Sequence, residues 1–114
     1  MQDSLANAAT LAAAIHAHEK YVVGYPGGIR ADLKFLKAPG LDLSWRRLDD
    51  IELSGADLPD ANLACANLSR ASLNCANIVR ANLSGANLWH ADLRGAHIQG
   101  VNFEMADIDR KSVV

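Results

Sequence analysis

A five-residue period runs through most of this chain and constrains its fold more than any other feature. From Ala56 the sequence reads ADLPD, ANLAC, ANLSR, ASLNC and ANIVR, and the same phase continues without insertion, for eleven units in all, to Arg110. Weaker units in the same phase extend back to Ala31, so that sixteen units cover residues 31–110. Self-similarity at a fixed short period is typical of a solenoid.

The spacing excludes an α-helix as the repeated structure. Five helical steps displace successive Leu positions by about 140°, so no continuous apolar face forms. Within a unit, the Ala and the Leu are two positions apart, which places both on one side of an extended segment. The chain must then turn once per unit, where Gly, Asn, Asp and Ser are frequent. Short extended segments and corners that always turn the same way predict an all-β repeat solenoid.

Tandem units of the form A-(D/N)-L-x-x make this chain similar to the pentapeptide repeat family. The resemblance covers residues 31–110 and implies a right-handed quadrilateral parallel β-helix with four units per coil, hence about four coils. The period alone leaves the number of units per coil open, because a coil of three units would also stack like on like, with Asn62 on Asn77.

Stacking of residues 20 positions apart predicts the core and several surface pairs. Outside, Asp50 stacks on Arg70 and Asp60 on Arg80, and we assign these exposed pairs to solubility. Inside, one Leu or Ile per unit stacks on its like, and each contributes about 1.5 to 3 kcal/mol before the entropy cost. The predicted core consists of Leu53, Leu58, Leu63, Leu68, Leu73, Ile78, Leu83, Leu88, Leu93 and Ile98.

Residues 1–30 predict a cap for the first coil. An Ala-rich segment with an N-cap at Asp3 or Ser4 indicates a helix, and a Gly and Pro turn ends it. A helix packed over the end of the solenoid would cover its unpaired backbone. The residues at helical spacing on its apolar face are Leu11, Ile15 and Val22.

The first coil, residues 31–50, is degenerate in sequence. Leu36, and Ile51 just after the coil, replace the small inward Ala, and Arg46 falls at an inward position where a charge needs a partner. We therefore expect a widened or partly irregular coil, with Trp45 covering the junction with the helix.

The other end of the repeat predicts a homodimer. A short tail, residues 111–114, follows the last unit, whereas a solenoid needs a cap or a partner at each end. We expect two chains to pair through the C-terminal coil around a two-fold axis. The residues assigned to this contact are Phe103, Met105, Ile108, Val113 and Val114.

Trp89 is the main candidate for contact with another protein. It stands at an outward position occupied by Ser69 and Asp109 in the neighbouring coils, and an exposed Trp is a frequent anchor in interfaces. The alternative is a ring that lies flat over neighbouring side chains. The predicted partner-binding residues are Trp89, His90, Arg70 and Arg80.

The remaining polar motifs do not predict catalysis. His16 and His18 would lie about 200° apart on a helix, which is unsuited to one metal ion. His90 and Asp92 flank a corner without a nucleophile, and a convex rod offers no cleft. We therefore predict no enzyme, no metal and no cofactor.

The cysteines and the termini bear on the compartment. Cys65 and Cys75 stand alone, without the second pair that a zinc site needs, and we expect free thiols on different faces. The Ala-rich N-terminus lacks the basic region of an export signal, and no segment has the length of a membrane span. We expect a bacterial-type cytoplasmic protein.

The function that these features favour is a non-catalytic protein interaction or assembly module with an unidentified protein partner, without direct nucleic-acid or membrane binding. The resemblance implies an alternative, a DNA-mimicking inhibitor of a type II topoisomerase such as gyrase. Mimicry requires dense negative charge, but residues 31–110 hold 11 acidic and 8 basic side chains, and residues 61–91 hold no acid. The charge pattern opposes this alternative, and an enzyme is a third, disfavoured class.

Overall fold

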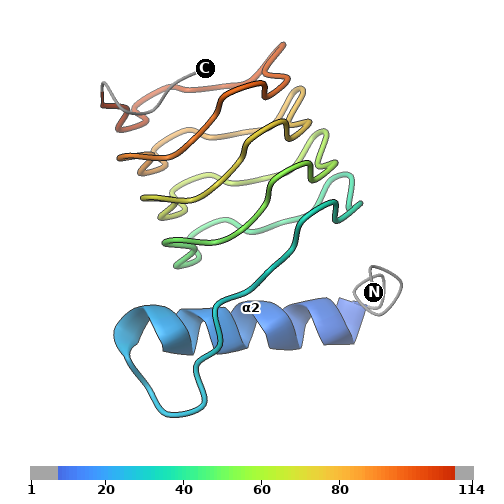
Figure 1. Ribbon diagram of the computed structural model, residues 1–114. Helices are drawn as coiled ribbons and strands as arrows, with labels where there is room; N and C mark the ends of the chain where they lie inside the picture. Colours follow the sequence, from blue (N-terminus) through green and yellow to red (C-terminus); the bar gives the residue numbers. More distant parts are fainter. Residues whose placement is uncertain (1–7, 110–114) are drawn as a thin grey trace.

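The computed structural model describes residues 8–109, which form one helix beneath a stack of coils (Figure 1). Helix α2 spans Ala8–Val23 and lies across the end of the stack. The chain then turns back through a Gly and Pro loop, enters the first coil at Ala31 and winds away from the helix. The predicted N-cap at Asp3 or Ser4 lies outside the described residues.

Consecutive coils pair through parallel backbone bridges between residues 20 positions apart. On one face the bridges join Asp32 to Glu52, Glu52 to Ser72, and Ser72 to Asp92. Three further faces carry the same series of bridges, each displaced by one pentapeptide. Each coil therefore has four sides, and the three-unit coil is excluded.

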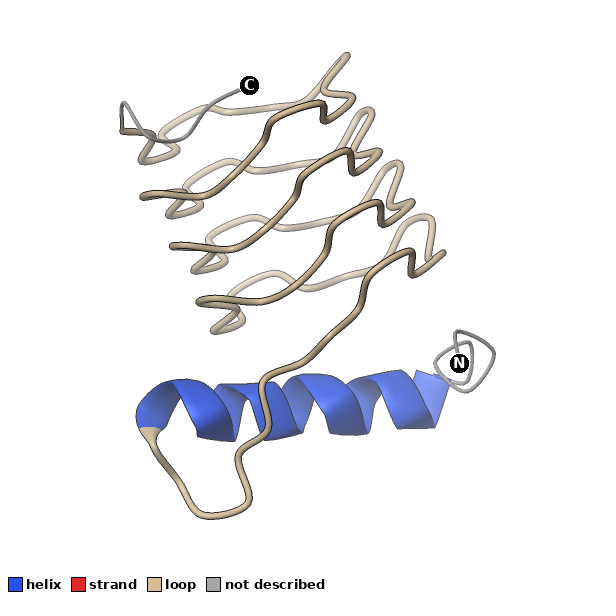
Figure 2. Ribbon diagram, viewed as in Figure 1, coloured by secondary structure: helices blue, strands red, loops and turns tan. Residues whose placement is uncertain are grey.

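Each side of a coil is too short for a continuous strand. The bridges are isolated single-residue pairings, and Figure 2 accordingly draws the described coils as loop. Two of the five residues in a unit form the turn, which leaves three extended residues, and the middle one makes the bridge. The prediction of parallel extended segments is confirmed in its register, whereas strands of several residues do not occur within residues 8–109.

Every described corner is a tight turn closed by a backbone hydrogen bond. At one such corner the N–H of Ala66 donates to the carbonyl of Leu63 at 3.1 Å, and Cys65 between them has a φ of 58°. The residue before the Leu supports the turn, because the Oδ1 of Asn62 accepts the backbone N–H of Ala64 at 3.1 Å. The recurring Asn or Asp of the repeat is thus explained by its role in the corner.

The inward Leu and Ile side chains form the predicted core. Nine of the ten predicted core residues are completely buried, and Ile98 in the last coil is partly buried. The small Ala that opens each unit is buried beside them, with Ala66 and Ala71 only 1% exposed. These small side chains let the corners approach one another closely, so the interior is narrow and continuously packed.

The first coil keeps the register of the others, so the expected irregularity of its backbone is absent. Leu36 and Ile51 are buried in place of the usual Ala. Arg46 avoids the interior, because its Nη1 binds the Oε1 of Glu19 in α2 at 3.0 Å. Trp45 is 76% exposed, so the expectation that it covers the helix junction is wrong.

Helix α2 covers the first coil through three buried side chains, Leu11, Ile15 and His18. Val22, which was expected on this face, is only partly buried, and His18 one turn earlier takes the inward place. One of the three buried side chains of the helix is thus polar. The junction between the helix and the rod is therefore less apolar than the contacts between the middle coils, whose buried side chains are almost all Leu, Ile and Ala.

Gly28 lies in the returning loop, close to the backbone of α2. A Cβ at Gly28 would lie 2.4 Å from the backbone nitrogen of Tyr21, so Gly28→Ala must displace the loop or the helix. Gly27→Ala is the matched control, because its Cβ would meet no atom within 4 Å and its cost, about 1 kcal/mol, arises from the φ of 83° alone. We expect a clearly larger loss of unfolding free energy for Gly28→Ala in thermal melts, and equal losses would contradict the close approach.

Candidate functional site

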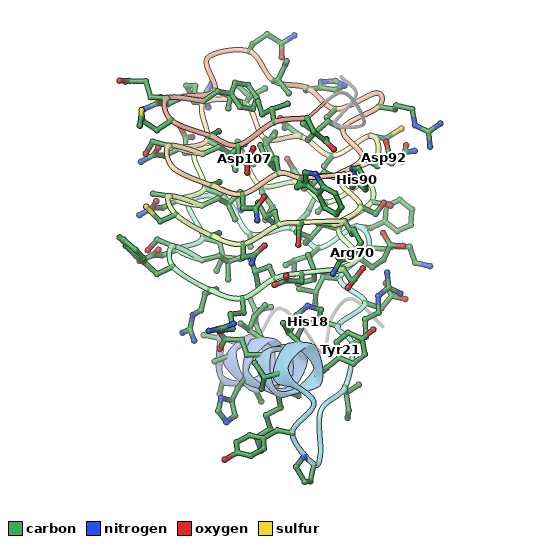
Figure 3. All side chains as sticks on the ribbon, turned by 90° about the vertical axis from the view of Figure 1, so that its left-hand side faces the viewer. His18, Tyr21, Arg70, His90, Asp92 and Asp107 are labelled. Atoms are coloured by element: carbon green, nitrogen blue, oxygen red, sulfur yellow. The ribbon has the colours of Figure 1, made fainter. Side chains whose placement is uncertain are left out.

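One corner of the rod brings together three of the four predicted partner-binding residues. Figure 3 shows Arg70 and His90 one above the other on the same face, and Trp89 precedes His90 at the same corner. Arg80 lies two corners away, so the structure does not group it with the others. We name this surface the Trp89 corner, which comprises Asp49, Asp50, Ser69, Arg70, Trp89, His90 and Asp109.

The Trp89 indole stacks on the His90 imidazole. The ring centroids lie 3.6 Å apart and the planes are inclined by 12°. His90 is held in turn by Asp109 of the next coil, whose carboxylate contacts the imidazole Nδ1 and accepts the His90 backbone N–H at 3.1 Å. The Trp89 ring thus lies flat over a neighbouring side chain, as the alternative predicted, and with 43% exposure it is still open to solvent.

Below this stack, Arg70 is fixed by Asp50 of the preceding coil. The guanidinium donates to both carboxylate oxygens, at 3.1 and 3.2 Å, and this pair raises the pKa of Arg70. Arg80 and Asp60 form the same bidentate pair at 2.9 and 3.0 Å. Both predicted ion pairs are confirmed, and all four side chains keep a large exposed fraction.

A buried polar contact beneath the corner was not predicted. The Ser69 hydroxyl donates to the Oδ2 of Asp49 at 2.9 Å, and Ser69 is only 5% exposed. The Oδ1 of Asp49 is buried and has no hydrogen-bond partner among the described residues. Stacking at 20 residues places these two side chains in one column, but the sequence alone does not show which of them turns inward.

The junction between α2 and the first coil depends on His18, whose role was also missed. The Nδ1 of His18 accepts the backbone N–H of Ala31 at 2.9 Å, so the Nε2 carries the proton and donates to the Asp49 carbonyl at 2.8 Å. His18 is completely buried, and this burial lowers its pKa. One neutral imidazole thereby satisfies two backbone groups of the first coil.

The last described coil presents the residues assigned to dimerisation with unequal exposure. Phe103 is partly buried, Ile108 is 45% exposed and Met105 is 91% exposed. Val113 and Val114 lie outside the described residues. Of the described members, Met105 and Ile108 are therefore the exposed apolar residues of the last described coil.

The two histidine motifs lie as their spacing indicated. His16 is exposed and His18 is buried, so their side chains diverge. Asp92 binds Arg94 at 2.8 Å, which lowers the pKa of Asp92 to about 2, while His90 contacts Asp109 instead. No group of three His, Cys, Asp or Glu side chains suited to a metal ion occurs in the described part of the chain.

Cys65 and Cys75 are free thiols at different corners of the rod. Among the described residues, no helix has the length and apolar character to cross a membrane.

A stack of four-sided coils with a capping helix defines the class of pentapeptide repeat solenoids, and the comparisons agree. The model of the family described as "Pentapeptide repeats" matches residues 40–74, 51–89 and 76–110, with eight copies of the repeat. This chain belongs to the pentapeptide repeat family. The search of curated proteins gives no match.

Solved structures of family members resemble the chain to different degrees. The pentapeptide repeat protein alr5209 from Nostoc Pcc 7120 is 35% identical with a TM-score of 0.64, over 85% of this chain and 80% of that chain. HetL, from Nostoc sp. strain PCC 7120 and involved in heterocyst differentiation regulation, is 34% identical with a TM-score of 0.41, over 67% of this chain and 38% of that chain. A pentapeptide repeat protein from the Arabidopsis thaliana thylakoid lumen is 26% identical with a TM-score of 0.43, over 61% and 60%.

The buried imidazole makes stability depend on pH. Because the folded pKa of His18 lies below 6.5, the unfolded chain takes up a proton first, so stability is greatest above pH 6.5 and falls as the pH decreases below it. Carboxylates begin to titrate only at lower pH. We expect His18→Gln to flatten the decline in melting temperature between about pH 7.5 and 5.5, because an amide donates and accepts without titrating. His16→Gln should retain the slope, and an unchanged slope in His18→Gln would contradict this role.

Proposed function

We propose that this protein is a non-catalytic protein interaction or assembly module, built on a rigid, right-handed, quadrilateral β-helical rod of four coils. The observation that carries this proposal is the Trp89 corner. There, a partly exposed indole is held by a stacked imidazole, which Asp109 anchors in turn. An ordered aromatic ring beside a fixed guanidinium is the composition that protein interfaces favour at their centres.

The backbone supports the proposal because it keeps the corner rigid. The N–H of Arg70 donates to the Trp89 carbonyl at 2.8 Å, and the N–H of Leu68 donates to the Asn87 carbonyl at 2.7 Å. Partner-binding side chains on such a frame lose little conformational entropy when they bind. The contacts of the indole with the imidazole, and of the imidazole with Asp109, favour one arrangement of both rings before binding and lower that cost further.

The ion pairs argue against the alternative of DNA mimicry. A protein that mimics duplex DNA needs an array of acidic side chains without bound cations. Here Asp50, Asp60 and Asp92 each bind one Arg through both carboxylate oxygens. A rod that neutralises its own acids presents a mixed surface. This arrangement favours a protein partner recognised through the Trp89 corner.

Removing the indole tests this proposal. We expect Trp89→Ala to weaken capture of the native partner by about thirtyfold, the loss expected of an interface anchor, in quantitative pull-downs with tagged protein from the native lysate. Trp45→Ala is the matched control, because Trp45 is more exposed and lies at another corner. Equal recovery with both variants would contradict the assignment, and recovery of a topoisomerase subunit would favour mimicry.

We propose in addition that two copies pair through the C-terminal coil. In the third coil, the N–H of Leu83 donates to the Asn102 carbonyl at 2.8 Å and the N–H of Gly85 donates to the Glu104 carbonyl at 2.8 Å. The equivalent N–H groups of Phe103 and Met105 find no acceptor within residues 8–109. Unpaired amides beside exposed Met105 and Ile108 make this edge suited to a second copy.

A charge placed on this edge tests the dimer. We expect the wild type to scatter light as a particle of about twice 12.2 kDa at micromolar concentration, and Met105→Asp with Ile108→Asp to give the monomer, because two-fold symmetry brings the new charges together. Trp45→Asp adds the same charge to an exposed apolar site on the first coil and should remain dimeric. A monomeric wild type would refute the dimer.

A further inference from the structure

A shallow groove lies where the second half of α2, the loop that follows it and the first coil meet. Its volume is about 270 Å³. His16, Lys20 and Val23 follow one another at helical spacing along one wall, while the loop and the coil supply the others. We name it the α2 groove, and it is lined by His16, Glu19, Lys20, Val23, Tyr25 and Arg47.

The two cations that line the α2 groove, Lys20 and Arg47, are not neutralised by the acid beside them. That acid, Glu19, is already committed, because Oε1 binds the Arg46 guanidinium at 3.0 Å and Oε2 accepts the Arg47 backbone N–H at 3.2 Å. Lys20 and the Arg47 guanidinium have no ion-pair partner in the described part of the chain. The groove therefore presents two uncompensated cations, although the whole chain has a net charge of −2.

Apolar surface adjoins these cations. Val23 is 54% exposed and Tyr25 is 67% exposed, at the end of α2 and in the loop that follows it. The loop is fixed to the helix, since the Tyr25 N–H donates to the Lys20 carbonyl at 2.9 Å.

We propose that the α2 groove binds an acidic segment of a partner protein, with carboxylates on Lys20 and Arg47 and one apolar side chain on Val23 and Tyr25. Charge complementarity selects an acidic segment and speeds its association. Burial of the apolar side chain adds to the affinity. The groove is small, so we expect a weak, transient complex.

A protein segment fits these features better than a nucleic acid or a membrane surface. Two cations beside a carboxylate cannot track a phosphate backbone, which requires an extended series of Lys and Arg. Anionic lipid surfaces likewise attract clusters of several basic residues. The inference is distinct from the Trp89 corner, because Trp89 and His90 lie in the third coil, two coils from Arg47, so its failure would leave that proposal intact.

The test uses a defined probe with the full chain. A fluorescein-labelled peptide of repeated Glu-Glu-Leu triplets is titrated with the protein and followed by anisotropy at low salt, and a Lys-Lys-Leu peptide is its counterpart. We expect saturable binding of the acidic peptide, and about five- to tenfold weaker binding by Lys20→Glu, because attraction becomes repulsion at one site. Arg47→Gln and Val23→Ser should each weaken binding as well.

Lys37→Glu is the matched control, since it makes the same charge change at an exposed Lys on another face. Thermal melts establish that every variant is folded. No saturable binding of the acidic peptide, equal binding of Lys20→Glu and Lys37→Glu, or preferred binding of the Lys-Lys-Leu peptide would each overturn the proposal. So would tighter binding of single-stranded DNA or phosphatidylserine vesicles, tested in parallel.

Discussion

Backbone hydrogen bonds between coils set the register on which the core and the surface pairs of this molecule depend. On one side of the rod, the N–H of Leu63 donates to the Asn82 carbonyl at 2.8 Å, and the N–H of Asn82 returns a bond of 2.9 Å to the Ala61 carbonyl. This exchange fixes a register of 20 residues, and a single inserted residue would shift every side chain above it to a different column. Surface residues 20 positions apart therefore lie one above the other in columns. Asp50 contacts Arg70 because of this spacing.

The same bonds make the two ends of the rod differ from its middle. A coil in the middle satisfies its neighbours on both sides, whereas a terminal coil leaves backbone groups that other parts must satisfy. At the first coil the buried imidazole of His18 satisfies two such groups. It accepts the backbone N–H of Ala31 and donates to the backbone carbonyl of Asp49. At the last described coil, the N–H groups of Phe103 and Met105 find no acceptor within residues 8–109, and the proposed pairing with a second copy would satisfy them. The two ends thus differ in kind, one closed from within the chain and the other suited to closure from outside it.

The sequence predicts those features that depend on the period and fails where side chains from different elements meet. Register, core and the Arg80 ion pair with Asp60 follow from spacing alone, because stacking makes residues 20 apart neighbours. The inward turn of His18 could not be predicted, since it depends on how α2 lies across the coil and on which backbone groups need a partner. The exposure of Trp45 was misjudged for the same reason. Within the Trp89 corner, the spacing predicts that Arg70 and His90 lie in one column. The contact of His90 with Asp109 depends on side-chain rotamers, which the spacing does not define.

The corners show why glycine recurs at some fifth positions and not at others. Positive φ does not require it, since Cys65 and Arg80 hold φ near 60° as well. What matters is the neighbour one coil earlier, because a Cβ at Gly55 would lie 2.5 Å from the Phe35 ring, and one at Gly85 would lie 3.0 Å from the Cys65 sulfur. At these two corners the side chain of the preceding coil takes the space that a Cβ would need, and glycine leaves that space free. Where the two side chains of a column pair with each other instead, as Asp50 does with Arg70 and Asp60 with Arg80, a long side chain occupies the fifth position of the later coil and glycine is not needed there.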